Sequence, residues 1–205
     1  MDSPIEPRFT SLAYALILLR EAGYPCVFYG DLYGISSPHR SPPTCGGKLA
    51  DLILARKLYA HGEQNDYFLN PNCVGWVRKG LSEAGGHKAA GMAVVMSWSS
   101  GTGNPRAEYV FSKMPWWARK LSDLLGLFGP RHESLEDAQR MNVGQNHSGE
   151  IWSDVLGGSQ HKVAISHDGS GTFSCSKNSV AVYAPETADG RDRFPVYFDS
   201  DIYSM

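Results

Sequence analysis

The sequence predicts an α/β segment over residues 1–64, followed by an antiparallel β-sandwich over residues 65–185 and a tail over residues 186–205. Two observations support this order. Up to residue 61, apolar residues recur with helical spacing on both sides of a short, continuous apolar run. Beyond Gly62, short runs rich in β-branched and aromatic residues alternate with turn residues, a pattern typical of an antiparallel sandwich or barrel.

The first helix is predicted over residues 7–23. Its apolar side chains recur at i, i+3, i+4, i+7 and i+8, which places them on one face of a helix. They are Phe9, Leu12, Ala13, Leu16 and Ile17. Gly23 stands where a left-handed C-terminal cap belongs, and Pro25 prevents the helix from continuing.

A strand is predicted next, over residues 26–29, because a continuous apolar run suits a parallel strand covered on both faces. Residues 31–47 are rich in Pro, Ser and Gly and are predicted to form a long loop. A second helix is predicted over residues 48–61, with Gly62 as its stop. This order is typical of the end of an alternating βα fold, in which the loop after the strand carries function.

The remainder of the chain predicts eight short strands and one helix. The strands are expected at residues 67–68, 73–77, 92–98, 107–111, 150–152, 162–165, 171–173 and 179–183. Residues 167–171 predict a hairpin turn between two of them. Residues 115–128 place Trp and Leu side chains on one helical face, which fits either a helix inserted on the sandwich or a helix at a membrane interface.

Composition narrows the classes of function. The chain has 42% hydrophobic and 20% charged residues and a net charge of −2, so it lacks the basic excess of a nucleic-acid-binding protein. No apolar stretch reaches the roughly 18 residues that span a bilayer, and no signal peptide is visible. Four cysteines without a CxxC pair favour a reducing compartment. We therefore expect a cytoplasmic chain with no membrane or nucleic-acid partner.

Asp31 is the candidate site residue, because it directly follows the predicted strand. A glycosidase needs two carboxyl groups that flank the sugar, and no second acid stands in the same context. On its own, Asp31 can equally be a loop residue that hydrogen-bonds backbone groups.

Five ordered blocks of the sequence resemble the C-terminal part of α-amylases of the bacterial liquefying and related fungal type. The first three are SLAYALILLREAGYPCVFYGDLYG, LILARKLYAHGEQNDYF and CVGWVRKG. The other two, RMNVGQNHSGEIWSDVLG and DGSGTFSCSKNSVAVY, resemble the C-terminal β-domain of that family. The resemblance runs from about residue 4 to residue 183 and is interrupted by an insertion around residues 104–138.

The resemblance implies the last part of a (β/α)8 barrel followed by a Greek-key sandwich. Residues 7–22 would be the seventh barrel helix, residues 26–29 the eighth strand and residues 48–61 the eighth helix. With so few barrel elements, the apolar side chains of the first 60 residues would lack partners, and we expect this part to be poorly ordered.

The resemblance also implies a fragment of a glycoside hydrolase that acts on the α-1,4-glucans starch and glycogen. The family's nucleophile, general acid and third aspartate lie upstream of the matching part, so no catalytic residue is expected here. We expect the chain to be inactive alone, with Asp31 and Tyr33 near substrate. The alternative is a non-catalytic glucan-binding or structural module, with Trp116 and Trp117 as candidate contacts in the insertion.

No metal or other cofactor is expected. Some bacterial relatives bind calcium where the barrel meets the sandwich, and the matching positions here are Asn72 and Trp98. An Asn side chain can offer a carbonyl oxygen, whereas an indole ring cannot ligate a hard cation.

Overall fold

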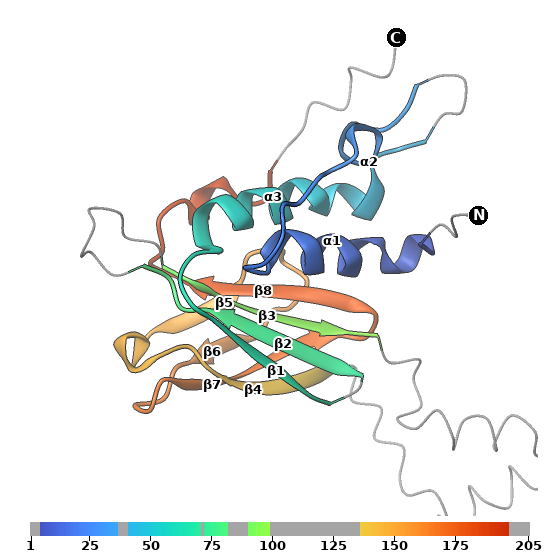
Figure 1. Cartoon of the computed structure of the whole chain (residues 1–205). Helices are drawn as coiled ribbons and strands as arrows, with labels where there is room; N and C mark the ends of the chain where they lie inside the picture. The colour runs from blue at the N-terminus through green and yellow to red at the C-terminus, as the bar shows by residue number, and fades with distance from the viewer. Residues whose placement is uncertain (1–4, 37–40, 71, 82–89, 99–135, 197–205) are drawn as a thin grey trace, which may run out of the picture.

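The protein has three layers, in which two helices cover one face of a large antiparallel sheet and a small sheet covers the other face (Figure 1). The computed structural model describes residues 5–36, 41–70, 72–81, 90–98 and 136–196. The α-helices in these ranges are α1 (Thr10–Leu19), α2 (Tyr29–Tyr33) and α3 (Lys48–Tyr59). Short 3-10 turns occur at Pro7–Phe9, Thr44–Gly47, Gln145–His147 and Arg191–Arg193.

Helices α1 and α3 confirm the two predicted long helices, with slightly earlier ends. α1 stops at Leu19 because Arg20 takes an extended conformation, and Gly23 follows with a φ of +98°. α3 stops at Tyr59, and Gly62 follows with a φ of +78°. Both glycines adopt the left-handed region that other residues avoid, which is why they end the helical pattern in the sequence.

The strand predicted over residues 26–29 is wrong. Residues 24–28 have no regular structure, and α2 begins at Tyr29. The Phe28 side chain is 61% exposed and Cys26 is exposed, so the run is not buried on two faces. A parallel strand needs hydrogen-bonded neighbours, and none of the described strands pairs with this segment. Instead, the Phe28 carbonyl accepts hydrogen bonds from the backbone of the following helix.

The described strands form a six-stranded and a two-stranded sheet, and all their pairings are antiparallel. In spatial order the large sheet contains β1 (Gln64–Asn70), β2 (Cys73–Arg78), β3 (Met92–Ser97), β8 (Ser179–Pro185), β5 (Ile151–Asp154) and β6 (Lys162–Ala164). The small sheet contains β4 (Glu136–Asn142) and β7 (Ser170–Ser176). Few helices followed by mostly antiparallel β structure agrees with the predicted order of a helical segment and an antiparallel β segment.

The structure departs from the sequence prediction at β4 and at the predicted hairpin turn. β4 was not expected, because its sequence is mostly polar. The turn at residues 167–170 is present, with the Ser166 N–H 2.8 Å from the Ser170 carbonyl oxygen. It does not form a hairpin, because β6 and β7 lie in different sheets. The predicted strand at 107–111 and helix at 115–128 lie outside the described residues.

Both faces of the large sheet are buried along its central strands β2, β3 and β8, and successive residues of these strands face opposite layers. On β3, Val94 packs in the cluster shared with α1 and α3, whereas Val95 packs in the cluster between the two sheets. On β8, Val182 packs in the cluster with the helices, and Tyr183 packs in the cluster between the sheets. This period of two follows from the pleat of a strand.

The sequence led us to expect that the first 60 residues would be poorly ordered for lack of packing partners. Among the described residues of this range, α1 and α3 instead pack on the large sheet. Leu12 is only 6% exposed, and the Trp76 indole N–H donates a hydrogen bond of 3.3 Å to the Leu19 carbonyl. The expected loss of partners does apply to Leu16, which is 40% exposed, and to Phe28.

The described part of the tail docks on α3. The Phe194 ring stacks on Tyr59 with centroids 6.1 Å apart, and the Val196 N–H donates to Asp51 Oδ1 at 2.7 Å. Burial raises the pKa of this Asp51 carboxyl. Within the described ranges, no helix has the length and apolar character needed to cross a membrane.

Candidate functional site

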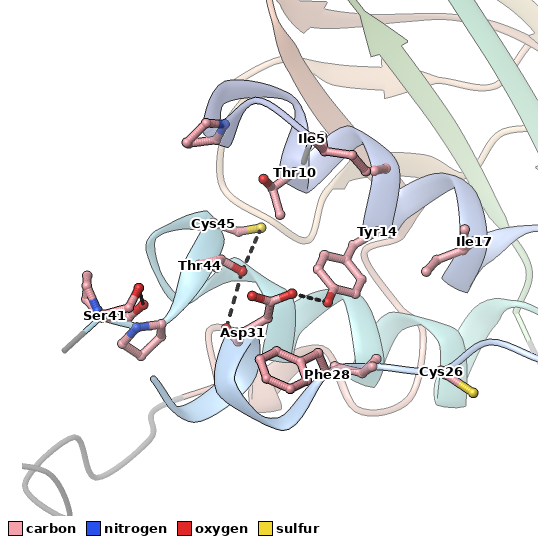
Figure 2. Close-up of a pocket in the computed structure, with 15 residues that line it drawn as sticks. Ile5, Thr10, Tyr14, Ile17, Cys26, Phe28, Asp31, Ser41, Thr44 and Cys45 are labelled. Atoms are coloured by element: carbon pink, nitrogen blue, oxygen red, sulfur yellow. Dashed lines mark hydrogen bonds between the residues drawn. The ribbon is translucent and has the colours of Figure 1, made fainter. Parts of the chain in front are cut away.

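The predicted site residue Asp31 lines a groove of about 980 Å³ (Figure 2). Its walls come from α1 and the residues before it, the irregular segment 26–28, α2 and residues 41–45. Apolar side chains form most of its lining, namely Ile5, Pro7, Ala13, Ile17, Val27, Phe28, Pro42 and Pro43. The polar lining consists of Thr10, Tyr14, Asp31, Ser41 and Thr44, with the thiols of Cys26 and Cys45. Asp31 is thus the only acid among the described residues that line the groove.

Asp31 is held in the groove by two contacts. The Tyr14 hydroxyl of α1 donates a hydrogen bond to Asp31 Oδ2 (Figure 2). The Thr44 hydroxyl donates to the Asp31 backbone carbonyl at 3.2 Å. Burial, together with the hydrogen bond to Asp31, raises the pKa of Tyr14 from its ordinary 10.0 to about 12. The groove therefore presents one half-buried carboxylate that Tyr14 holds, on a backbone that Thr44 contacts.

Tyr14 is a site residue that the sequence reasoning missed. It lies 17 residues from Asp31 and within an almost wholly apolar helix. A buried tyrosine usually finds a hydrogen-bond partner for its hydroxyl. The presence of Tyr14 in an apolar helix was therefore the available signal that a polar group lies next to its hydroxyl.

Tyr33 does not share the groove with Asp31. It lines a separate hollow of about 320 Å³ beside α3, together with Leu32 and Lys57. Its ring lies 4.7 Å from that of Tyr29 at an angle of 40°. The structure therefore places the two predicted substrate-binding residues on the same short helix but in different recesses.

The Tyr14–Asp31 contact predicts a pH-dependent signal. We expect Asp31→Asn to lower the pKa of Tyr14 from about 12 part of the way to 10.0, because the burial that contributes most to the shift remains. Since the folded-state pKa is raised, the stability that Tyr14 contributes is complete below pH 10 and is lost as the pH approaches 12. Titration of ¹³C-tyrosine resonances measures the shift. An unchanged Tyr14 titration would contradict the contact, and Asp66→Asn, at an exposed pair with Arg20, is the matched control.

The two positions considered for calcium lie side by side, because the Trp98 N–H donates to the Asn72 carbonyl at 3.1 Å. The Trp98 side chain has no oxygen to offer, so this pair does not fit a hard cation. Across the described ranges, no three His, Cys, Asp or Glu side chains gather as metal ligands. Trp116 and Trp117 lie outside the described residues.

Comparison with known proteins finds no matching family model but several relatives. A glucan 1,4-alpha-maltohexaosidase of Bacillus sp. (strain 707) is 36% identical over 183 residues, which is 89% of this chain and 28% of that protein. An alpha-amylase of Geobacillus stearothermophilus is 34% identical over 185 residues, or 90% of this chain and 26% of that protein. A cytoplasmic alpha-amylase of Escherichia coli (strain K12) is 32% identical over 195 residues, which is 91% of this chain and 31% of that protein. The chain spans less than a third of the length of these relatives.

Proposed function

Because this chain is homologous to the α-amylase family of glycoside hydrolases over about 90% of its length, we propose that it supplies the C-terminal part of an enzyme that cleaves α-1,4-linked glucans. The observation that carries this proposal is the 36% identity to a maltohexaosidase along almost the whole chain. The alignment corresponds to only 28% of that relative, so this chain supplies one part of the proposed enzyme.

In this proposal α1, residues 26–29 and α3 correspond to the end of a (β/α)8 barrel, and the two sheets correspond to a Greek-key sandwich. Exposed apolar side chains on α1 and at residues 28–29 support the correspondence with a barrel. They are Leu16, Ile17, Phe28 and Tyr29, between 40% and 66% exposed. Neighbouring barrel elements would cover such a surface.

The proposed role of Asp31 is to bind substrate at the rim of the cleft, with Tyr33 as a second contact. Glycoside hydrolysis uses two carboxyl groups roughly 5–9.5 Å apart. The groove presents a single acid among its described lining residues, and that acid is already hydrogen-bonded to Tyr14. We therefore propose that this chain binds glucan weakly and does not hydrolyse it alone.

Release of maltooligosaccharides from soluble starch tests this proposal. We expect the purified chain to release none above the blank, while an intact α-amylase in the same assay releases them readily. Release by the chain that persists after purification to homogeneity would contradict the proposed inactivity.

A second candidate function is a glucan-binding module, which the exposed aromatic side chains near the groove favour. Tyr24 is 94% exposed, and Tyr29 is 66% exposed. Exposed aromatic rings are suited to the apolar faces of sugars. Retardation in a glycogen-containing gel that is lost in Tyr24→Ala/Tyr29→Ala or in Trp116→Ala/Trp117→Ala, with the fold intact, would favour this function.

The proposed location of the chain is the cytoplasm, and its proposed partner is an α-glucan polysaccharide. All four cysteines are free thiols, which suits a reducing compartment. The net charge of −2 does not favour a nucleic-acid partner.

A further inference from the structure

Two of the free cysteines meet between the two sheets. Cys73 is the first residue of β2 in the large sheet, and Cys175 lies near the end of β7 in the small sheet. They are 0% and 1% exposed and belong to the same apolar cluster. The sequence separates them by about a hundred residues, so only the packing of the sheets brings them together.

The strand register fixes this juxtaposition. Cys73 pairs with Ser97 across β2 and β3, and Cys175 pairs with Asp137 across β4 and β7. The Ser97 hydroxyl donates a hydrogen bond to Asp137 Oδ2, which joins one sheet to the other. Directly opposite residues of an antiparallel pair have Cβ atoms only about 4.5–5.5 Å apart. The two thiols therefore flank the same point of contact between the sheets.

The two neighbouring thiols shift each other's pKa in opposite directions. The interaction with Cys175 lowers the pKa of Cys73, and the interaction with Cys73 raises the pKa of Cys175. Cys73 is thus the thiol that loses its proton more readily. A thiolate is the nucleophile in thiol–disulfide exchange.

We propose that Cys73 and Cys175 form a dithiol site that a disulfide oxidant such as oxidised glutathione converts into a disulfide between the two sheets. The Cys73 thiolate attacks the glutathione disulfide and releases one glutathione thiolate. The Cys175 thiolate then attacks the mixed disulfide at the Cys73 sulfur and releases the second glutathione. The protein loses two protons and two electrons, and one glutathione disulfide is reduced to two thiols.

Access for the oxidant comes from the position of the pair at strand ends. Cys73 begins β2, and its register partner Ser97 ends β3. Strand ends open locally far more often than strand centres. Oxidation of the folded chain is therefore expected to be slow, whereas oxidation during refolding, before the sheets close, is expected to be fast.

The crosslink is expected to raise the unfolding temperature. It closes a loop of about a hundred residues and so restricts the unfolded chain, while the two side chains already lie in the same buried apolar cluster of the folded chain. A loop of this length predicts a rise of roughly 10 °C in the unfolding midpoint of the oxidised chain relative to the reduced chain.

The test treats the full chain with oxidised glutathione in two arms, one folded and one during refolding from denaturant. Intact mass and a non-reducing peptide map identify the linked residues. We expect a mass loss of about 2 Da and a Cys73–Cys175 peptide in at least the refolding arm. Cys26→Ser/Cys45→Ser is expected to form the same crosslink, because these two thiols line the separate groove near α1.

Cys175→Val and Cys73→Ala serve as separate negative controls, and both are expected to fold and to show no oxidant-dependent rise in unfolding temperature. Absence of the Cys73–Cys175 peptide from both arms would overturn the proposal, and so would a crosslink between Cys26 and Cys45 alone. A crosslinked chain that unfolds at a lower temperature than the reduced chain would also overturn it.

Discussion

Gly62→Ala is expected to destabilise the fold by about 4 kcal/mol or more, whereas Gly23→Ala is expected to cost only about 1–2 kcal/mol. Both glycines have a positive φ, +78° and +98°, so the backbone strain of an alanine is similar. The two positions differ in the room that they leave for a Cβ atom. A Cβ at Gly62 would lie 1.9 Å from the Gly80 carbonyl oxygen, whereas a Cβ at Gly23 would meet nothing within 4 Å. Urea unfolding of the two variants measures the difference.

The close approach at Gly62 fastens α3 to the large sheet. The Arg78 guanidinium donates to the Gly62 carbonyl at 3.0 and 2.8 Å, and the Gly80 N–H donates to the His61 carbonyl at 3.0 Å. An alanine at Gly62 must displace the backbone of this junction. Equal losses of stability in the two variants would show that left-handed strain alone accounts for the effect, and would contradict the contact.

Asp154→Ala is expected to destabilise the fold by about 3 kcal/mol or more, because a single buried carboxylate serves several backbone donors. Asp154 is 8% exposed. Its Oδ1 accepts from the N–H groups of Leu156 and Val182, and its Oδ2 accepts from those of Gly158 and Ser159, all at 2.8–3.0 Å. An alanine leaves these donors unpaired within the fold. Denaturant unfolding, followed by tryptophan fluorescence, measures the loss.

Asp168→Ala is the matched control for this prediction. Asp168 also accepts a backbone hydrogen bond, from Ser170 at 3.0 Å, and it pairs with Arg140 at 3.3 Å, but it is exposed to solvent. Water can replace such contacts, so the expected loss is small. Asp154→Asn should fall between the two aspartate-to-alanine variants, because one amide oxygen still accepts hydrogen bonds. Similar stabilities of Asp154→Ala and Asp168→Ala would contradict the proposed role of the buried carboxylate.

Local sequence signals were enough to predict a helix or strand where the segment itself contains the residues that set its type and its ends. α1 and α3 were predictable because apolar residues recur with helical spacing and because Gly23 and Gly62 follow the ends. Strands β2, β3 and β8 of the large sheet were predictable for a related reason. Most of their residues are buried on both faces, so they appear as short, continuous apolar runs.

The failures occurred where distant contacts decide the structure. The run at residues 26–29 has the composition of a buried strand but pairs with no described strand, so its composition alone could not set its conformation. β4 is mostly polar and is recognised only through its pairing with β7.

The candidate site was only partly predictable from the sequence. Asp31 was identified because it follows an apolar run, but its contact with Tyr14 depends on how α1 packs near α2. Tyr33 was grouped with Asp31 because the two are close in sequence. Residues two apart on a helix point in different directions, and the structure places them in different recesses.

The proposed role in glucan cleavage is tested most directly by starch hydrolysis in a chimera. In the chimera, the 183 matching residues of this chain replace the homologous segment of the Bacillus sp. (strain 707) maltohexaosidase. We expect the folded chimera to release maltooligosaccharides from soluble starch, and this chain alone to release none. A folded chimera without activity, or release by this chain alone, would contradict the proposed role.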